Sequence, residues 1–118
     1  MEAGVKLADL DPEFIRWGIN GGGDGFHRVD SIDEAHGIMF VCPKCADGSG
    51  HRVICWSRSR GTPEDVHPLP GRWAIRGTSF ADLTLDGDVG NANANRSVQL
   101  QGGCNAHFHV TNGEIQPA

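Results

Sequence analysis

Ile38-Met39-Phe40-Val41-Cys42-Pro43-Lys44-Cys45 is the stretch of the sequence that decides the fold. Its first four residues form a continuous apolar run, which is short enough for a strand buried on both faces. The run leads directly into two cysteines separated by two residues. After the glycine-rich turn 47–50 follows His51-Arg52-Val53-Ile54-Cys55-Trp56, which has the composition of a second strand. We therefore predict a β-hairpin with the cysteine pair at its tip.

Further strands are expected after this hairpin. The candidates are residues 72–75, 80–85, 97–101, 107–111 and 114–116. The last two flank Asn112-Gly113, the favoured sequence of a tight hairpin turn. Upstream, Ser31 and Glu34 form a capping box that predicts a helix of little more than one turn, closed by Gly37. The fold class is therefore mainly β: a small, single-domain fold of sheets and hairpins with one short helix.

Two short motifs are typical of metal ligands. They are Cys42-x-x-Cys45 and Cys104-x-x-His107, the second preceded by two glycines that allow the chain to bend sharply. A structural zinc site usually takes four thiolate or imidazole ligands, supplied as two pairs from separate tight turns. We therefore predict one zinc ion bound by Cys42, Cys45, Cys104 and His107 as a zinc knuckle. Its binding free energy would add to the stability of a modest core.

Other uses of these side chains stay open. Cys42 and Cys45 have the spacing of a thioredoxin-like redox pair, although such a pair is followed by a helix and here a strand pattern follows. His51 and Cys55 share a strand face and could approach the metal, or Cys55 could be a small core residue. His109 shares a face with His107, as in the His-x-His iron site at the tip of trimeric spikes, or it is simply exposed.

The N-terminal residues have a different character. Leu7, Leu10, Phe14, Ile15 and Trp17 are spaced like a helical turn or a packing arm, and residues 11–13 (Asp-Pro-Glu) look like a helix start. A glycine-rich break follows. We accordingly divide the chain into an N-terminal arm with this break, residues 1–25, and a zinc-stabilised β domain, residues 26–118. The arm has two possible destinations: its own sheet or a neighbouring subunit.

Composition excludes several classes of partner. The 118 residues carry ten basic and fifteen acidic side chains, a formal charge of −5. This charge argues against binding to nucleic acid or to an anionic membrane, which normally rests on clustered Lys and Arg. The N-terminus has no apolar run typical of a secretory signal, and no stretch approaches the roughly 20 apolar residues of a membrane span. We expect a protein of the reducing cytoplasm, unless it leaves the cell inside a larger assembly.

A resemblance to a known family rests on three segments, Gly37–Cys45, Gly50–Trp56 and Gly103–Ile115. They resemble the DUF6527 family, small Cys/His-containing uncharacterised proteins of phages, prophages and bacterial operons. Many relatives carry a Cys-x-Cys-Gly-Cys knuckle where this chain has Cys42-x-x-Cys45. The resemblance implies metal binding and a phage-like origin, and with it a place in the cytoplasm of the host cell or in a virion. Some relatives are labelled ammonia monooxygenase, but this chain lacks the membrane spans and copper-binding histidines that the label requires.

The functional expectation follows from these observations. No metalloprotease, serine hydrolase or deaminase motif is present, and a zinc ion with four protein ligands has no open position for a substrate. We expect a non-enzymatic, zinc-stabilised structural or interaction protein of phage or prophage origin that associates with another protein or with itself. No small-molecule substrate is evident. The alternative is a metal-dependent hydrolase or an accessory protein of a bacterial ubiquitin-like conjugation pathway, since some relatives lie in such operons.

Overall fold

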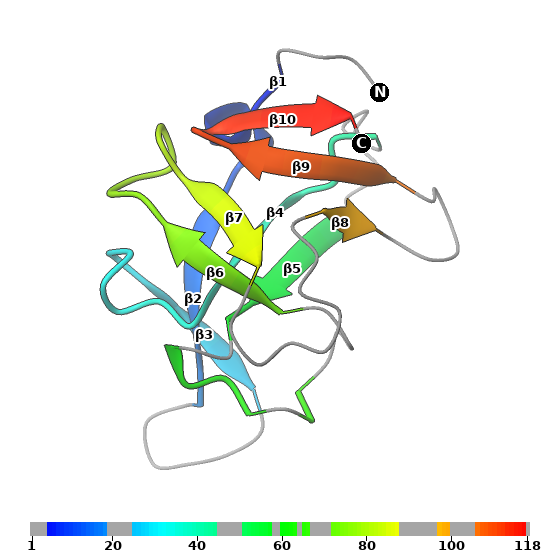
Figure 1. The fold of residues 1–118 in the computed structure, drawn as a ribbon. Helices are drawn as coiled ribbons and strands as arrows, with labels where there is room; N and C mark the ends of the chain where they lie inside the picture. Colours follow the sequence, from blue (N-terminus) through cyan, green and yellow to red (C-terminus); the bar gives the residue numbers. More distant parts are fainter. Residues whose placement is uncertain are drawn as a thin grey trace.

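The computed structural model describes residues 5–18, 25–44, 51–57, 60–63, 65–66, 72–87, 97–99 and 106–117. The elements are β1 Val5–Lys6, the 3-10 helix η1 Leu7–Leu10, β2 Glu13–Trp17, β3 Phe26–Val29, β4 Gly37–Val41, β5 Arg52–Trp56, β6 Trp73–Arg76, β7 Thr84–Gly87, β8 Val98–Gln99, β9 His107–Thr111 and β10 Glu114–Pro117 (Figure 1). The protein is therefore mainly β, as predicted.

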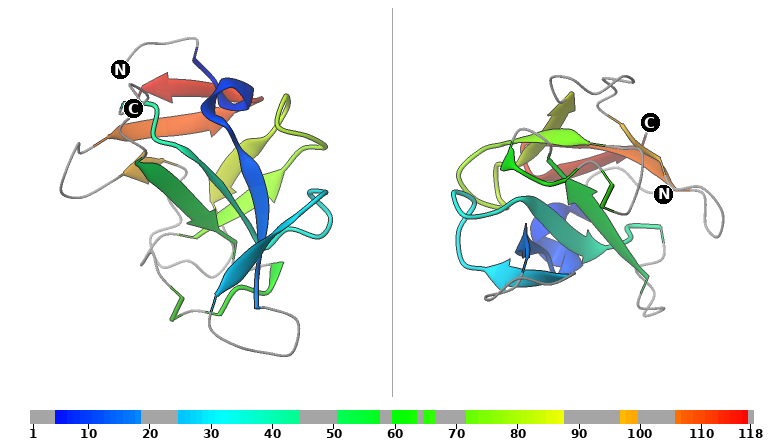
Figure 2. Two further views of the ribbon diagram at one scale, coloured as in Figure 1. Left: turned by 180° about the vertical axis from the view of Figure 1, so that it is seen from behind. Right: turned by 90° about the horizontal axis from the view of Figure 1, so that it is seen from below.

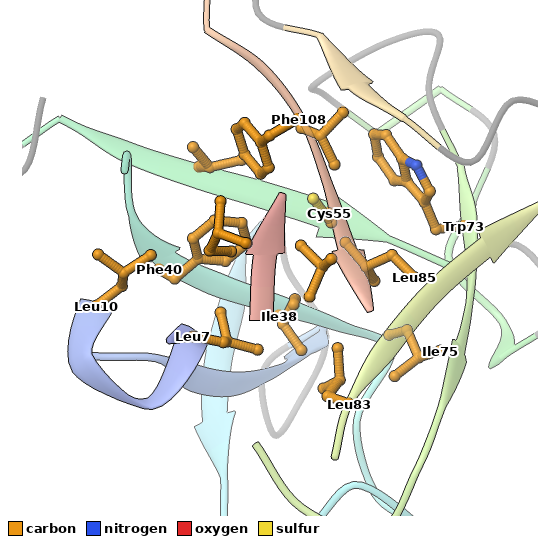
Figure 3. Close-up of a cluster of buried hydrophobic side chains, with 14 of the residues drawn as sticks. Leu7, Leu10, Ile38, Phe40, Cys55, Trp73, Ile75, Leu83, Leu85 and Phe108 are labelled. Atoms are coloured by element: carbon orange, nitrogen blue, oxygen red, sulfur yellow. The ribbon is translucent and has the colours of Figure 1, made fainter. Parts of the chain in front are cut away.

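The described strands form three antiparallel sheets. Two have four strands, in the orders β1-β10-β9-β8 and β3-β2-β4-β5, and the third consists of β6 and β7. Figure 2 shows these sheets from two further sides. Side chains from all three sheets meet in one hydrophobic cluster (Figure 3). Within this cluster Phe40 of β4 and Phe108 of β9 contact edge to face, with ring centroids 6.0 Å apart. This contact joins the two four-stranded sheets.

The predicted hairpin of β4 and β5 is confirmed. Ile38 lies opposite Cys55, and Phe40 lies opposite Val53. The ladder continues past the strand ends, because the Cys42 N–H donates to the His51 carbonyl over 2.9 Å. The hairpin of β9 and β10 around Asn112-Gly113 is also confirmed. The expected strands 72–75 and 97–101 correspond to β6 and β8, although β8 is shorter than expected in the part of the chain that is described.

The N-terminal segment corrects the expected helix start at residues 11–13. Asp11 has a left-handed backbone with φ of 49° and ends η1, after which β2 pairs with both β3 and β4. Phe14 lies in the main cluster, whereas Ile15 on the other face packs with Trp56 in a second cluster. The segment therefore packs back on its own sheets. The division expected at residue 25 falls between two paired strands.

The capping box at Ser31 does not form an α-helix. The Glu34 N–H donates to the Ser31 carbonyl over 3.3 Å, and the chain makes only a turn before β4. The Arg60 guanidinium binds the carbonyl of Ile32 at 2.6 Å, and the Arg16 guanidinium binds the carbonyl of Glu34 at 3.1 Å. These two carbonyl groups therefore have hydrogen-bond donors outside the turn, and they do not need the N–H groups of a further helical turn.

The expected strand 80–85 begins later, at Thr84. Residues 77–83 form a turn because the Asp82 carboxylate accepts hydrogen bonds from the backbone N–H groups of Ser79, at 2.8 Å, and Thr78, at 2.9 Å. These bonds lower the pKa of Asp82. This turn packs against the turn of the β9–β10 hairpin, where the Gly113 N–H donates to the Leu83 carbonyl over 2.8 Å.

Gly113 allows a test of this packing. Its φ is +74°, and a Cβ there would collide with the backbone of Phe80 and Ala81. Gly18 is a matched control, since its φ is +91° but a Cβ would meet nothing within 4 Å. We expect Gly18→Ala to lower the free energy of unfolding by about 1–2 kcal/mol through backbone strain alone. Gly113→Ala should lower it by about 2–5 kcal/mol through strain and collision together. Equal losses in urea denaturation would contradict the packing of the turn.

Candidate metal centre

The end of β4 and the start of β9 lie at the same end of the molecule (Figures 1 and 2). The contact of Phe40 with Phe108 explains this placement, because Cys42 follows Phe40 by two residues and His107 immediately precedes Phe108. β8 lies at the same end, where Val98 pairs with Phe108. The Trp73 indole N–H holds its start by donating to the Ser97 carbonyl over 3.3 Å. Two of the four expected ligands are thus in neighbouring parts of the fold.

Cys42 is fully buried and belongs to the main hydrophobic cluster. It follows β4 in the same alternation as Ile38 and Phe40, whose side chains also face this cluster. The Cys42 side chain therefore lies at the rim of the core. A ligand in this position is shielded from water, which is usual for a structural metal site.

His107 lies on the outer face of β9, opposite to the face that carries Phe108 and Val110. β9 alternates between an exposed His107, a buried Phe108, a half-buried His109 and a buried Val110. His107 and His109 therefore share the outer face, as their spacing predicted. A metal bound by both Cys42 and His107 must consequently lie at the boundary between the core and the solvent, beyond the strand ends.

Cys45 and Cys104 lie outside the described residues. Within the part of the chain that is described, no three His, Cys, Asp or Glu side chains gather in a metal-binding group. Of the expected ligands, only Cys42 and His107 are described, and they lie at the same end of the fold without forming such a group, so the zinc site stays a prediction. The soft donor set and the shared end of the fold fit a zinc ion placed at the rim of the core.

Cys55 has the environment of a core residue. It is fully buried in β5, and its sulfur points among Ile38, Leu85 and Phe108 (Figure 3). Burial raises the pKa of the Cys55 thiol far above its usual range. Because a metal ligand must be a thiolate, this environment disfavours Cys55 as a ligand. The interpretation of Cys55 as a small core residue is the one that the packing supports.

His51 contributes its backbone to the hairpin. Its carbonyl accepts the hydrogen bond from the Cys42 N–H, and its side chain is exposed. This position is next to the expected ligand pair but on the solvent side of the strand end. Among the described residues, His51 is thus the alternative ligand that is paired with Cys42 across the hairpin.

Sequence reasoning missed a second group of titratable side chains, at the other end of β4. His36 accepts a hydrogen bond from the Trp17 N–H, and His27 donates one to the Gly18 carbonyl. Arg16 and Arg60 lie close enough to His36 to affect its protonation. The only sequence signal was a histidine next to the glycine that starts an apolar strand.

Comparison with models of protein families, with curated protein sequences and with solved structures found no match to this chain. The chemistry of the site must therefore be argued from its own residues.

Substitution of Cys55 tests its role as a core residue. We expect Cys55→Ala to lower the free energy of unfolding by about 1–2 kcal/mol through the lost packing. Cys55→Ser should be at least as destabilising, by roughly 1–3 kcal/mol, because its hydroxyl would be buried among apolar side chains. Neither change should alter the metal content of the purified protein. Loss of metal on Cys55→Ala, measured by elemental analysis, would make Cys55 a ligand.

Proposed function

We propose that the protein is a non-enzymatic structural or interaction domain, stabilised by one zinc ion bound to Cys42, Cys45, Cys104 and His107. The observation that carries the proposal is the contact of Phe40 with Phe108, which supports a common site because Cys42 follows Phe40 by two residues and His107 precedes Phe108. The burial of Cys42 at the rim of the core and the donor set Cys₃His support it further. When bound, zinc would supply a cross-link between the two four-stranded sheets.

A structural role suits the energetics of this fold. β4 and β9 belong to different sheets, and the described contact between them is made by side chains, without a shared hydrogen-bond ladder. A metal held by both strands would act on the folded state alone, so its binding free energy would stabilise that state. Four protein ligands would leave no open coordination position for a substrate. Function would then depend on the surfaces that the cross-linked sheets present.

The resemblance to the DUF6527 family supports a phage or prophage origin within this proposal. A protein partner, or a second copy of the chain, is the proposed binding partner. The acidic net charge of −5 supports a protein rather than a nucleic acid. No helix among the described residues is long and apolar enough to cross a membrane.

Paired substitutions test the metal site. We expect protein purified without chelator to contain one zinc per chain, and Cys42→Ser to remove the metal and destabilise the fold by on the order of several kcal/mol. His107→Asn should also lower zinc content, whereas His109→Asn should leave it unchanged, since only His107 belongs to the proposed ligand set. Elemental analysis and thermal denaturation measure both effects.

Three results would overturn parts of this proposal. Absence of metal from the purified wild type would remove the zinc site. Loss of zinc on His109→Asn, with zinc retained on His107→Asn, would change the ligand set. X-ray absorption showing three protein ligands and one water would favour the metal-dependent hydrolase instead, because a catalytic zinc keeps one position open.

A further inference from the structure

His36 lies immediately before β4 and takes part in the pairing of β2. Its backbone N–H donates to the Ile15 carbonyl over 2.8 Å, one residue beyond the last β2–β4 pair, Ile15 and Gly37. The N–H of Trp17, two residues after Ile15, donates to Nδ1 of the His36 ring over 3.2 Å. The imidazole nitrogen thus takes the place of the backbone carbonyl that a longer β4 would have offered.

This hydrogen bond requires neutral His36. A nitrogen can accept from the Trp17 N–H only through its lone pair, so the ring must carry its proton on Nε2. Protonation would place a second N–H opposite the first. His27 differs, because its Nδ1 lies 2.6 Å from the Gly18 carbonyl oxygen and therefore donates. Protonation of His27 leaves that bond intact.

The backbone of His36 is held in place from both sides. Besides the bond from its N–H to Ile15, its carbonyl accepts hydrogen bonds from the Ser57 N–H, at 2.9 Å, and the Thr62 hydroxyl, at 3.2 Å.

The charges around His36 oppose its protonation. Burial lowers the pKa of His36 most, and the positive charges of Arg16 on β2, His27 on β3 and Arg60 after β5 lower it further.

Three aromatic side chains, Trp17, Trp56 and Phe26, contact one another at the Trp17 end of β2. Trp17 contacts Trp56 edge to face at 6.2 Å between ring centroids, and Phe26 of β3 contacts the same ring at 5.8 Å. Phe26 is 38% exposed, more than any other large hydrophobic side chain in the described part of the chain. Any movement of the end of β2 therefore changes the solvent-exposed area of these three aromatic side chains.

We propose that His36 is a pH-sensitive switch, whose protonation releases the Trp17 N–H and lets the end of β2 open together with Trp17 and Phe26. At neutral pH the ring is uncharged and the closed arrangement holds. In acid the open form takes up a proton that the closed form resists. Opening thus exposes apolar aromatic surface only in acidic surroundings, independently of any metal.

The sign and size of the effect follow from linkage. The ordinary pKa of histidine, about 6.5, applies to the open form, and the pKa in the closed form is lower. The closed arrangement is therefore fully stable above pH 6.5. Below it, the equilibrium constant for opening rises by up to about tenfold per pH unit, until the pH falls below the pKa of the closed form.

Amide hydrogen exchange by NMR on the full chain tests the switch. After correction for the intrinsic exchange rate at each pH, the protection of the Trp17 amide should fall by up to about tenfold per pH unit below pH 6.5. The amide of Phe40 in β4 should keep its protection over the same range. The ¹⁵N shift of His36 Nδ1 should show an unprotonated nitrogen at pH 7.5.

Two matched variants separate the histidines. His36→Asn retains an acceptor oxygen near the place of Nδ1 but cannot titrate, so the pH response of Trp17 should disappear. His27→Asn retains a donor for the Gly18 carbonyl, so the response should persist, with its onset still near pH 6.5. A Trp17 amide whose protection is constant between pH 5 and 8 in the wild type would overturn the proposal. So would an unchanged response in His36→Asn, or an equal loss of protection at Phe40, which would indicate global unfolding.

Discussion

The contact between Phe40 and Phe108 is the interaction on which the arrangement of the sheets depends. Each ring comes from a strand inside a four-stranded sheet, and both are fully buried. An edge-to-face aromatic pair stabilises by about 0.5–1.5 kcal/mol beyond the area that it buries. Its larger effect is geometric, because it fixes the neighbours of both rings. Cys42 and His107 lie at one end of the fold because their strands meet through this pair.

The sequence revealed the strands that carry long apolar runs or clear turns. The run 38–41 and the Asn112-Gly113 turn predicted their hairpins correctly, because a central buried strand and a two-residue turn are set by local chemistry. β2 was missed for a physical reason. Phe14 packs in the main cluster and Ile15 in the second, so both faces of the strand are apolar and the alternation of a half-exposed strand is absent.

The candidate site could be predicted only in part. Short spacings predict ligand pairs, since two residues between ligands form a tight turn. The pairing stays a prediction, because Cys45 and Cys104 lie outside the described residues and no metal-binding group is seen among the others. What spacing cannot show is the face of each side chain. His107 faces outward while Cys42 faces the core, because β9 must turn Phe108 and Val110 inward. Spacing also could not show that Cys55 packs as a core residue, because its burial arises from contacts between distant strands.

β4 separates two groups of titratable side chains. His36 precedes its first residue and Cys42 follows its last, and both extend the hydrogen bonding with β5, through the His36 carbonyl and the Cys42 N–H. Six residues of extended chain span roughly 20 Å. That distance exceeds the Debye length of about 8 Å at physiological ionic strength, so charges exposed at one end have little direct effect at the other. The two proposals therefore concern separate ends of β4. Loss of the proposed zinc would weaken the junction of the two large sheets, whereas the proposed protonation of His36 would loosen the end of β2 and leave the Phe40–Phe108 contact in place.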